Sequence, residues 1–284
     1  MRYLILGAGG MAGHMISNYL IEEGEYVEGI ERRELGFCKT YVLDVTNFSL
    51  LKDIVYQGEY DYIINCIGLL NQFAEENIPL AILLNSYLPH YLVEVTSNIN
   101  TRIIQMSTDC VFSGKKGKYT ETDFPDGETF YDRTKALGEI NDKKNLTFRN
   151  SIIGPDTNKN GIGLLNWFMS QTGGLKGYQK SIWTGVSTLT LAKAMHKASY
   201  CGLTGIYNLV NNQNISKYDL LELFNKYSNK NLKIEKINGI IQDKSLYRTR
   251  DDFSFVVPSY DIQVKELYEW IDSHKEFYPH YITK

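Results

Sequence analysis

Short apolar runs separated by amphipathic stretches organise the first half of the chain. Apolar runs of strand length occur at residues 3–6, 26–30, 40–42, 62–66, 102–106 and 146–149. Between them, apolar positions recur with helical spacing at residues 11–23, 50–55, 79–98 and 131–140. Strands that alternate with helices predict a parallel sheet covered by helices on both faces.

The alternation loosens after about residue 150. A loop is expected at residues 154–163, and helices are expected near 164–171, 189–200 and 262–273. We therefore expect an α/β protein in two parts. Residues 1–150 would form a doubly wound parallel sheet, to which some later segments return, and residues 151–284 would mainly form a smaller lobe laid over it.

The composition is that of an ordinary globular protein, with 43% hydrophobic and 22% charged residues among 284. A formal net charge of -3 provides no basic excess for binding nucleic acid. The four cysteines form no CxxC pair and the five histidines are scattered. We therefore expect neither a disulfide framework nor a metal site.

The start of the chain lacks the features of a secretory signal. Only residues 3–6 are apolar before the first glycine, and no run of about 18 apolar residues occurs anywhere in the chain. We expect a cytoplasmic protein with no membrane segment.

The string LGAGGMAG places Gly7, Gly10 and Gly13 between a predicted strand and a predicted helix. Glycines at this spacing permit a tight turn, close approach of the backbone to a pyrophosphate, and close packing of the helix. The helix N-terminus adds free N–H groups and a favourable dipole. In this context the pattern predicts a dinucleotide-binding domain of Rossmann type in residues 1–150.

The residues after the second predicted strand bear on the choice of cofactor. Glu31 stands about where an acidic residue binds the adenosine ribose of NAD. Arg32 and Arg33 follow at once, and an arginine pair can bind a 2′-phosphate bidentately, unless both are solvated surface charges. The site mixes NAD and NADP patterns, and we favour NADPH over NADH.

A tyrosine and a lysine form the candidate catalytic pair. The segment YDRTK places Tyr131 and Lys135 four residues apart at the start of a predicted helix, hence on one face. The lysine cation is expected to lower the pKa of Tyr131, which suits acid–base catalysis. The segment STDCVFSG brings Ser107 and Thr108 to the carboxyl edge of the sheet, where such sheets bind ligands. Thr108 can donate to a substrate oxygen there, or merely cap a turn.

Together these motifs resemble the extended short-chain dehydrogenase/reductase family, and within it the reductases of dTDP-4-dehydrorhamnose type. The first half carries the glycine turn, LDVTN around Asp44, NCIG at residues 65–68, Asn85, STDCVF and YDRTKALGE. The second half carries similar strings, namely RNSIIGP from residue 149, WTGVSTLTLAK from residue 183 and GIYNLV from residue 205.

The resemblance implies an NAD(P)H-dependent oxidoreductase that reduces a nucleotide-linked 4-keto-6-deoxy sugar in deoxysugar or polysaccharide biosynthesis. Tyr131 would donate the proton, Lys135 would tune Tyr131 and hold the nicotinamide ribose, and Thr108 would hydrogen-bond the reacting oxygen. The glycine turn and the resemblance together imply a cofactor site of Gly7, Gly10, Met11, Gly13, Glu31, Arg32, Arg33, Asp44, Val45, Asn65, Cys66, Ile67, Gly68, Asn85, Ser107, Tyr131 and Lys135. The implied substrate site is Thr108, Asp109, Cys110, Tyr131, Asn150, Trp183, Arg248 and Arg250.

Some assignments on the substrate side stay open. Trp183 is equally a candidate core residue, and Arg248 and Arg250 are equally candidate partners of Asp251 or Asp252. Dehydrorhamnose reductases proper tend to carry an aromatic residue where this chain has Ile152, which leaves the sugar open. The nucleotide base, the sugar stereochemistry and the assembly, a homodimer included, also stay open.

Cys110 separates the related activities. Sugar nucleotide 4,6-dehydratases carry a Glu at this position, whereas the epimerase-reductases that make GDP-fucose carry a Cys together with a His. Here Asp156 stands where that His would follow the Gly-Pro pair, so the epimerising pair is incomplete, and an epimerase or epimerase-reductase is the alternative activity. An alternative of another class is a non-catalytic NADP-binding subunit, like the regulatory partner of methionine adenosyltransferase. The intact Thr108, Tyr131 and Lys135 argue against it.

Overall fold

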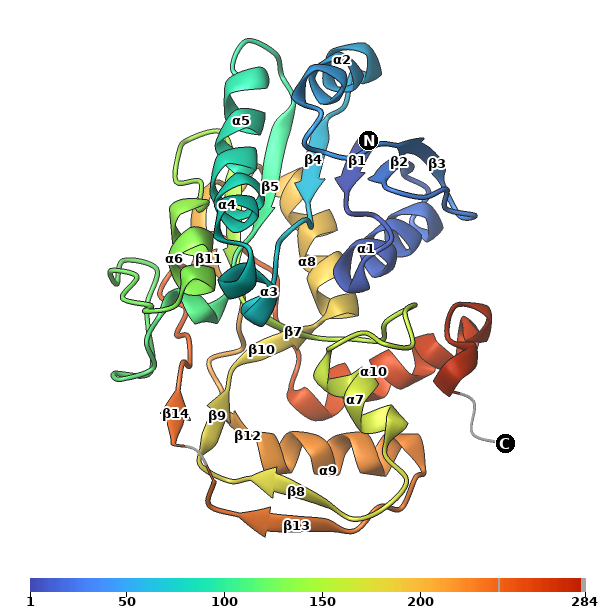
Figure 1. Ribbon diagram of the computed structural model, residues 1–284, viewed down its shortest axis with the longest axis vertical. Coiled ribbons are helices and arrows are strands. Elements are labelled where there is room, and N and C mark those ends of the chain that lie inside the picture. The colour runs from blue at the N-terminus through green and yellow to red at the C-terminus, as the bar shows by residue number, and fades with distance from the viewer. Residues whose placement is uncertain (240, 282–284) are drawn as a thin grey trace.

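A seven-stranded parallel sheet forms the centre of the protein (Figure 1). The computed structural model describes residues 1–239 and 241–281. The strand order is β11-β6-β5-β4-β1-β2-β3, and every neighbouring pair is parallel. The strands are β1 (Arg2–Leu6), β2 (Tyr26–Glu31), β3 (Lys39–Val42), β4 (Tyr62–Asn65), β5 (Arg102–Met106), β6 (Leu146–Arg149) and β11 (Gly205–Asn208). The prediction of a parallel α/β sheet is confirmed.

Helices cover both faces of the sheet because its strands present apolar side chains on both sides. In β1, Tyr3 and Ile5 pack in one hydrophobic cluster, whereas Leu4 and Leu6 alternate with them into another. On the face of the first cluster, the sheet is covered by side chains of α1 (Met11–Glu22) and α8 (Thr188–Cys201). The second contains α2 (Phe48–Gly58) and α5 (Leu88–Val95).

A smaller lobe lies below the carboxyl ends of the strands (Figure 1). Its three helices share one hydrophobic core, to which they contribute Phe168, Phe224 and Leu267. Those helices are α7 (Leu164–Ser170), α9 (Lys217–Ser228) and α10 (Tyr260–Ser273). Its short strands are β7 (Ser151–Ile153), β8 (Leu175–Tyr178), β9 (Ser181–Trp183), β10 (Gly185–Ser187), β12 (Ile215–Ser216), β13 (Ile234–Ile237) and β14 (Gln242–Asp243). Of the later segments, α8 and β11 return to the sheet.

The helix predicted at residues 79–98 forms as one helical run over residues 78–95, with a π-helical turn inside it. After α3 (Asn71–Glu76) come α4 (Ile78–Ala81), a π-helical turn η1 (Ile82–Tyr87), and then α5. Pro89 lacks an N–H, so the carbonyl of Asn85 cannot receive an α-helical hydrogen bond from it, and the ladder widens at this point. Gly138 packs against the same carbonyl, because a Cβ at Gly138 would lie 1.8 Å from the Asn85 oxygen.

Within residues 1–239 and 241–281, no helix combines the length and the apolar character needed to cross a membrane.

Candidate functional site

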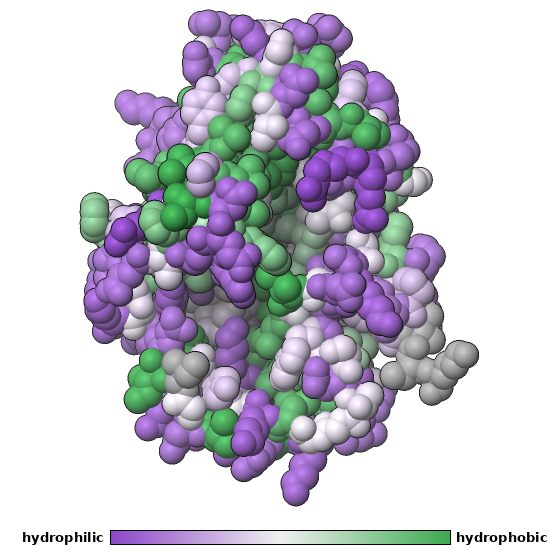
Figure 2. All heavy atoms as spheres, viewed as in Figure 1, coloured by the Kyte–Doolittle hydropathy of each residue, from purple (hydrophilic) through white to green (hydrophobic). Residues whose placement is uncertain are grey.

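A cleft of about 290 Å³ opens at the carboxyl edge of the sheet, beside the point where the strand order reverses between β1 and β4. Open α/β sheets bind their ligands at such a point. Figure 2 shows the surface hollowed between the sheet and the lobe. The cleft brings together nine of the predicted cofactor residues, namely Gly7, Gly10, Glu31, Arg32, Asp44, Val45, Cys66, Ile67 and Gly68.

The glycine turn has the shape that a dinucleotide requires. Gly7 has a φ of 75°, in the left-handed region that favours glycine. A Cβ at Gly13 would lie 2.0 Å from the carbonyl oxygen of Gly7, so only glycine lets the helix approach this closely. Gly10 is the N-cap of α1 and Met11 is the first helical residue. No side chain among the described residues caps this end. The first N–H groups of the helix are therefore available to a pyrophosphate.

The far end of the cleft contains the residues expected near adenosine. The Glu31 carboxylate accepts hydrogen bonds from the backbone N–H groups of Gly9 at 3.1 Å and Arg32 at 2.9 Å. Arg32 lines the cleft, whereas Arg33 is exposed outside its lining. Hydrogen bonds from Thr46, with a smaller contribution from Arg32, hold the pKa of Asp44 below its usual value.

Asn85 links the loop that follows β4 to helix α6 (Phe130–Leu137). Its Oδ1 accepts the N–H of Leu69 at 2.8 Å, and its Nδ2 donates to the Leu69 carbonyl and to the Thr134 hydroxyl. Asn65 stabilises the same loop by accepting the N–H of Ile67 at 3.1 Å. Neither asparagine lines the cleft, and both shape it from behind.

Tyr131, Lys135 and Thr108 meet at the carboxyl edge. Helix α6 (Phe130–Leu137) begins at a capping box between Thr129 and Asp132, which fixes the position of Tyr131. Thr108 follows β5, lies near Tyr131 and caps the turn η2 (Asp109–Val111). Its hydroxyl donates to the Asp109 carboxylate at 3.1 Å and accepts the N–H of Cys110 at 3.1 Å. The side chains of Tyr131, Lys135 and Thr108 are buried, at 7%, 6% and 8% exposed.

Burial controls the protonation of this set. It raises the pKa of Tyr131 above its usual value and outweighs the effect of the nearby Thr108 hydroxyl, which acts in the opposite direction. The Lys135 ammonium donates to the Met106 carbonyl at 2.7 Å, and burial lowers its pKa to about 8. Burial is therefore the dominant effect on the pKa of Tyr131 in this structure, and the expected lowering by Lys135 stays a prediction.

A buried ion pair that was not predicted from the sequence lies beside the candidate catalytic residues. The Glu139 carboxylate accepts hydrogen bonds from Arg149 at 2.6 and 2.8 Å and from the Ser107 hydroxyl at 2.6 Å. The two charged side chains are only 1% and 5% exposed. The pair therefore holds Ser107, the neighbour of Thr108, in place. Both residues stood within the strings YDRTKALGE and RNSIIGP, but spacing alone gave no sign of their contact.

Asn150 follows β6 and is 2% exposed. Neither atom of its side-chain amide has a hydrogen-bond partner among the described residues. Buried polar groups are nearly always paired, so an unpaired amide beside a candidate site is consistent with a polar ligand. Asp109 is also buried, and its pKa is raised by burial, an effect that Lys217 and Lys244 oppose.

The remaining predicted substrate residues are engaged within the protein. Trp183 is 3% exposed and packs on Tyr260 in the lobe core. Arg250 pairs with Asp252 and donates to two backbone carbonyls. Arg248 lies 3.4 Å from the Tyr207 hydroxyl. Trp183 is therefore a core residue and Arg250 is a partner of Asp252, as the alternatives stated in the sequence analysis had it.

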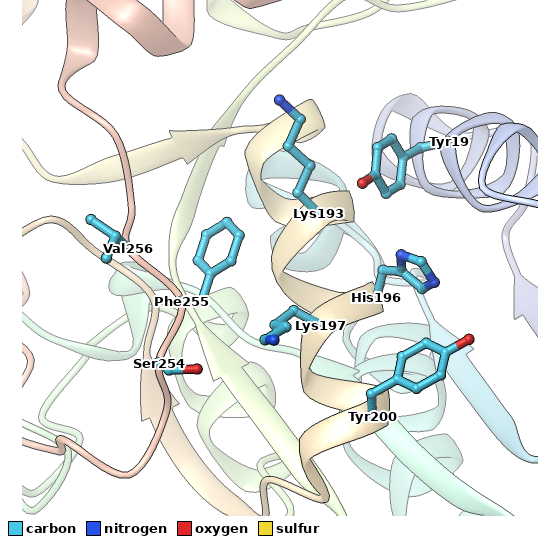
Figure 3. Close-up of a pocket in the computed structure, with 8 residues that line it drawn as sticks. All are labelled: Tyr19, Lys193, His196, Lys197, Tyr200, Ser254, Phe255 and Val256. Atoms are coloured by element: carbon cyan, nitrogen blue, oxygen red, sulfur yellow. The ribbon is translucent and has the colours of Figure 1, made fainter.

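A larger open groove of about 750 Å³ lies between α8 and the segment that precedes α10 (Figure 3). Lys193 pairs with Glu266 at 2.9 Å, and the His196 ring and the Tyr200 hydroxyl both bond to Glu25. None of the lining residues is a predicted cofactor or substrate residue, whereas nine predicted cofactor residues line the cleft at the sheet edge, so we assign the site to that cleft. The lining is Tyr19, Lys193, His196, Lys197, Tyr200, Ser254, Phe255 and Val256.

Solved structures share the fold of this chain. The dTDP-4-dehydrorhamnose reductase from Bacillus anthracis, in complex with NADP, superposes with a TM-score of 0.81 at 20% identity. The superposition covers 95% of this chain and 99% of that one.

Sequence relatives extend the comparison. The chain is 35% identical over 140 residues to dTDP-4-dehydrorhamnose reductase from Aggregatibacter actinomycetemcomitans, which covers 49% of this chain and 45% of that protein. It is 24% identical over 237 residues to methionine adenosyltransferase 2 subunit beta from Xenopus laevis, which covers 77% and 70%. The chain spans about half the length of the dTDP-4-dehydrorhamnose reductases it matches. The sequence family described as the RmlD substrate binding domain matches residues 1–250, which include the glycine turn, Thr108, Tyr131 and Lys135, and the chain therefore belongs to this family.

Proposed function

We propose that this chain is an NADPH-dependent reductase that acts on the C4 carbonyl of a nucleotide-linked 4-keto-6-deoxy sugar. The observation that carries the proposal is that Tyr131, Lys135 and Thr108 are buried next to the glycine-turn cleft, where the Lys135 Nζ would lie 3.8 Å from a Cβ on Gly68 in the cleft lining. Membership of the RmlD family and the names of the dTDP-4-dehydrorhamnose reductases among its relatives support the substrate class.

The buried hydroxyls supply the proton and the hydrogen bonds that the reduction needs. When bound, the reduced nicotinamide supplies the hydride that goes to the carbonyl carbon. Tyr131 donates its proton to the carbonyl oxygen as negative charge develops there, and Thr108 hydrogen-bonds the same oxygen. A raised pKa keeps Tyr131 protonated at neutral pH, as a proton donor must be. Lys135 adds positive charge to the site and holds the ribose.

A panel of 4-keto sugar nucleotides tests the proposal directly. The panel should vary the base, and turnover is measured as loss of the absorbance of NADPH. We expect turnover with at least one dTDP-, UDP-, GDP- or CDP-linked sugar. Tight binding of NADPH without turnover on any of them would favour the alternative of a non-catalytic NADP-binding subunit.

Arg32 should determine the preference for NADPH. Arg32→Ala should weaken NADPH binding by about 1–3 kcal/mol, because a charge-assisted contact to the 2′-phosphate is lost, and should leave NADH binding unchanged. Arg33→Ala is the matched control and should have little effect, since Arg33 lies outside the cleft lining. Fluorescence titrations measure the affinity of the wild type and of each variant for NADPH and NADH. A clear preference of the wild type for NADH would instead assign the site to Glu31.

Cys110 should have no role in proton transfer. Burial, reinforced by Asp109, raises the pKa of its thiol to about 12, so the thiolate is scarce at neutral pH. Cys110→Ser should keep turnover within about tenfold of wild type. Deuterium from solvent should not enter the sugar at C3 or C5 in either protein. Mass spectrometry that detects such incorporation would support the epimerase-reductase alternative.

A further inference from the structure

Lys217, the first residue of α9, places a half-buried ammonium at the lobe side of the site. Its Nζ lies 5.7 Å from the ring centroid of Trp183. Its charge also acts on Asp109 and Cys110, the two residues directly after Thr108. Lys217 thus lies between the lobe core and the reacting end of the site.

The ammonium of Lys217 makes no ion pair and no hydrogen bond with any part of the chain that the structure describes. Its neighbour Lys244 differs, because it lies 3.7 Å from the Asp132 carboxylate. A cation removed from water without a partner costs free energy, and burial accordingly lowers the pKa of Lys217. This arrangement is what a binding site for an anion requires before the anion arrives.

A second unpaired polar group lies near Trp183. Asn150 precedes β7, and β7 pairs with β10 so that Ser151 lies opposite Gly185. A Cβ on Gly185 would lie 2.2 Å from the Trp183 ring, so the backbone after Asn150 runs close to the tryptophan. The buried amide of Asn150 has no partner among the described residues. An unpaired donor and an unpaired cation near one aromatic ring point to a ligand that is polar and negatively charged.

We propose that Lys217 binds the diphosphate of the nucleotide sugar, an inference that rests on the reductase function proposed above. A 4-keto-6-deoxy sugar is neutral, so the phosphates carry the negative charge next to it. Lysine suits a phosphate as a point charge. Lys244 is the other cation whose charge acts on Asp109, and it lies 3.7 Å from the Asp132 carboxylate, so among the described residues Lys217 is the cation beside Asp109 that has no such partner.

The test measures binding of nucleoside diphosphates, with NADPH present at saturation so that the cofactor site is filled. Lys217→Met should weaken binding of the preferred diphosphate by about 10- to 100-fold, as expected for loss of a hydrogen bond to a charged group. Lys217→Arg should retain most of the affinity. The matched control is Lys236→Met, since Lys236 lies 4.9 Å from the Tyr218 ring on the same lobe, and it should bind as wild type does.

The outcomes separate this inference from the proposed function. Unchanged binding in Lys217→Met, or no binding of any nucleoside diphosphate to the wild type, overturns the inference even if reductase turnover is found. Lys217-dependent binding without turnover on any 4-keto sugar nucleotide supports the inference and counts against the reductase. With an active substrate, Lys217→Met should raise KM and leave kcat nearly unchanged, because the diphosphate is bound equally before and during the reaction. Thermal unfolding of each variant checks that it is folded.

Discussion

Replacing Tyr131 with Phe should lower turnover by about 100- to 10,000-fold, the range expected when a general acid is lost. Cofactor affinity should stay nearly unchanged. The side chain is buried and phenylalanine fills almost the same volume, so the fold should be retained. Single-turnover kinetics with a confirmed substrate separate the chemical step from binding. A Tyr131→Phe protein with near-normal turnover would remove Tyr131 from the mechanism.

Lys135→Met provides the contrast, because it should weaken cofactor binding and turnover together. The pKa of Lys135 also determines the direction in which cofactor affinity should change with pH. Its pKa is lowered to about 8, so the ammonium is present below that pH and is lost as the pH rises through it. Cofactor affinity of the wild type should therefore fall above about pH 8. The affinity of Lys135→Met should be lower and should lack this step.

Replacing Glu139 with Ala should lower the free energy of unfolding by about 3–5 kcal/mol. The substitution leaves the Arg149 guanidinium buried without its partner, and the Ser107 hydroxyl loses its acceptor. Urea unfolding measures the change. The matched control is Glu128→Ala, which breaks an exposed ion pair with Lys115 and should leave the free energy of unfolding nearly unchanged.

Equal losses for the two glutamate variants would show that the buried pair contributes no more than a surface pair. The loss of Glu139 should affect turnover as well as stability. Ser107 directly precedes Thr108, so loss of Glu139 should also lower turnover under conditions where the variant remains folded. Lowered stability with unchanged kcat and KM would confine the role of Glu139 to the fold.

The features that local sequence predicts well are those whose cause is local. Strands β1 and β4 are short apolar runs, and the glycine turn shows its three glycines at fixed spacing. The Tyr131 and Lys135 pair follows from helical periodicity. Each depends only on residues close together in the chain.

The features that were missed depend on contacts between distant segments. Strands of two to four residues in the lobe, such as β12 and β13, are too short to produce a periodic signal. Helix α9 was missed although Leu220, Leu221 and Phe224 give it a buried face, so there the signal was present. No spacing rule connects Lys217 with Asp109, because the fold alone brings them together.

The return of the chain to the sheet has a consequence for the order in which the protein folds. Strand β11 pairs with β6 after the intervening residues have passed through the lobe and α8, and Tyr207 then packs edge-on against Phe148. The edge of the sheet is thus completed by a non-local parallel pairing, which is slow to form because a long loop must close first. Folding should therefore be limited by the arrival of β11, and this side of the sheet should be completed late, after the glycine turn is already in place.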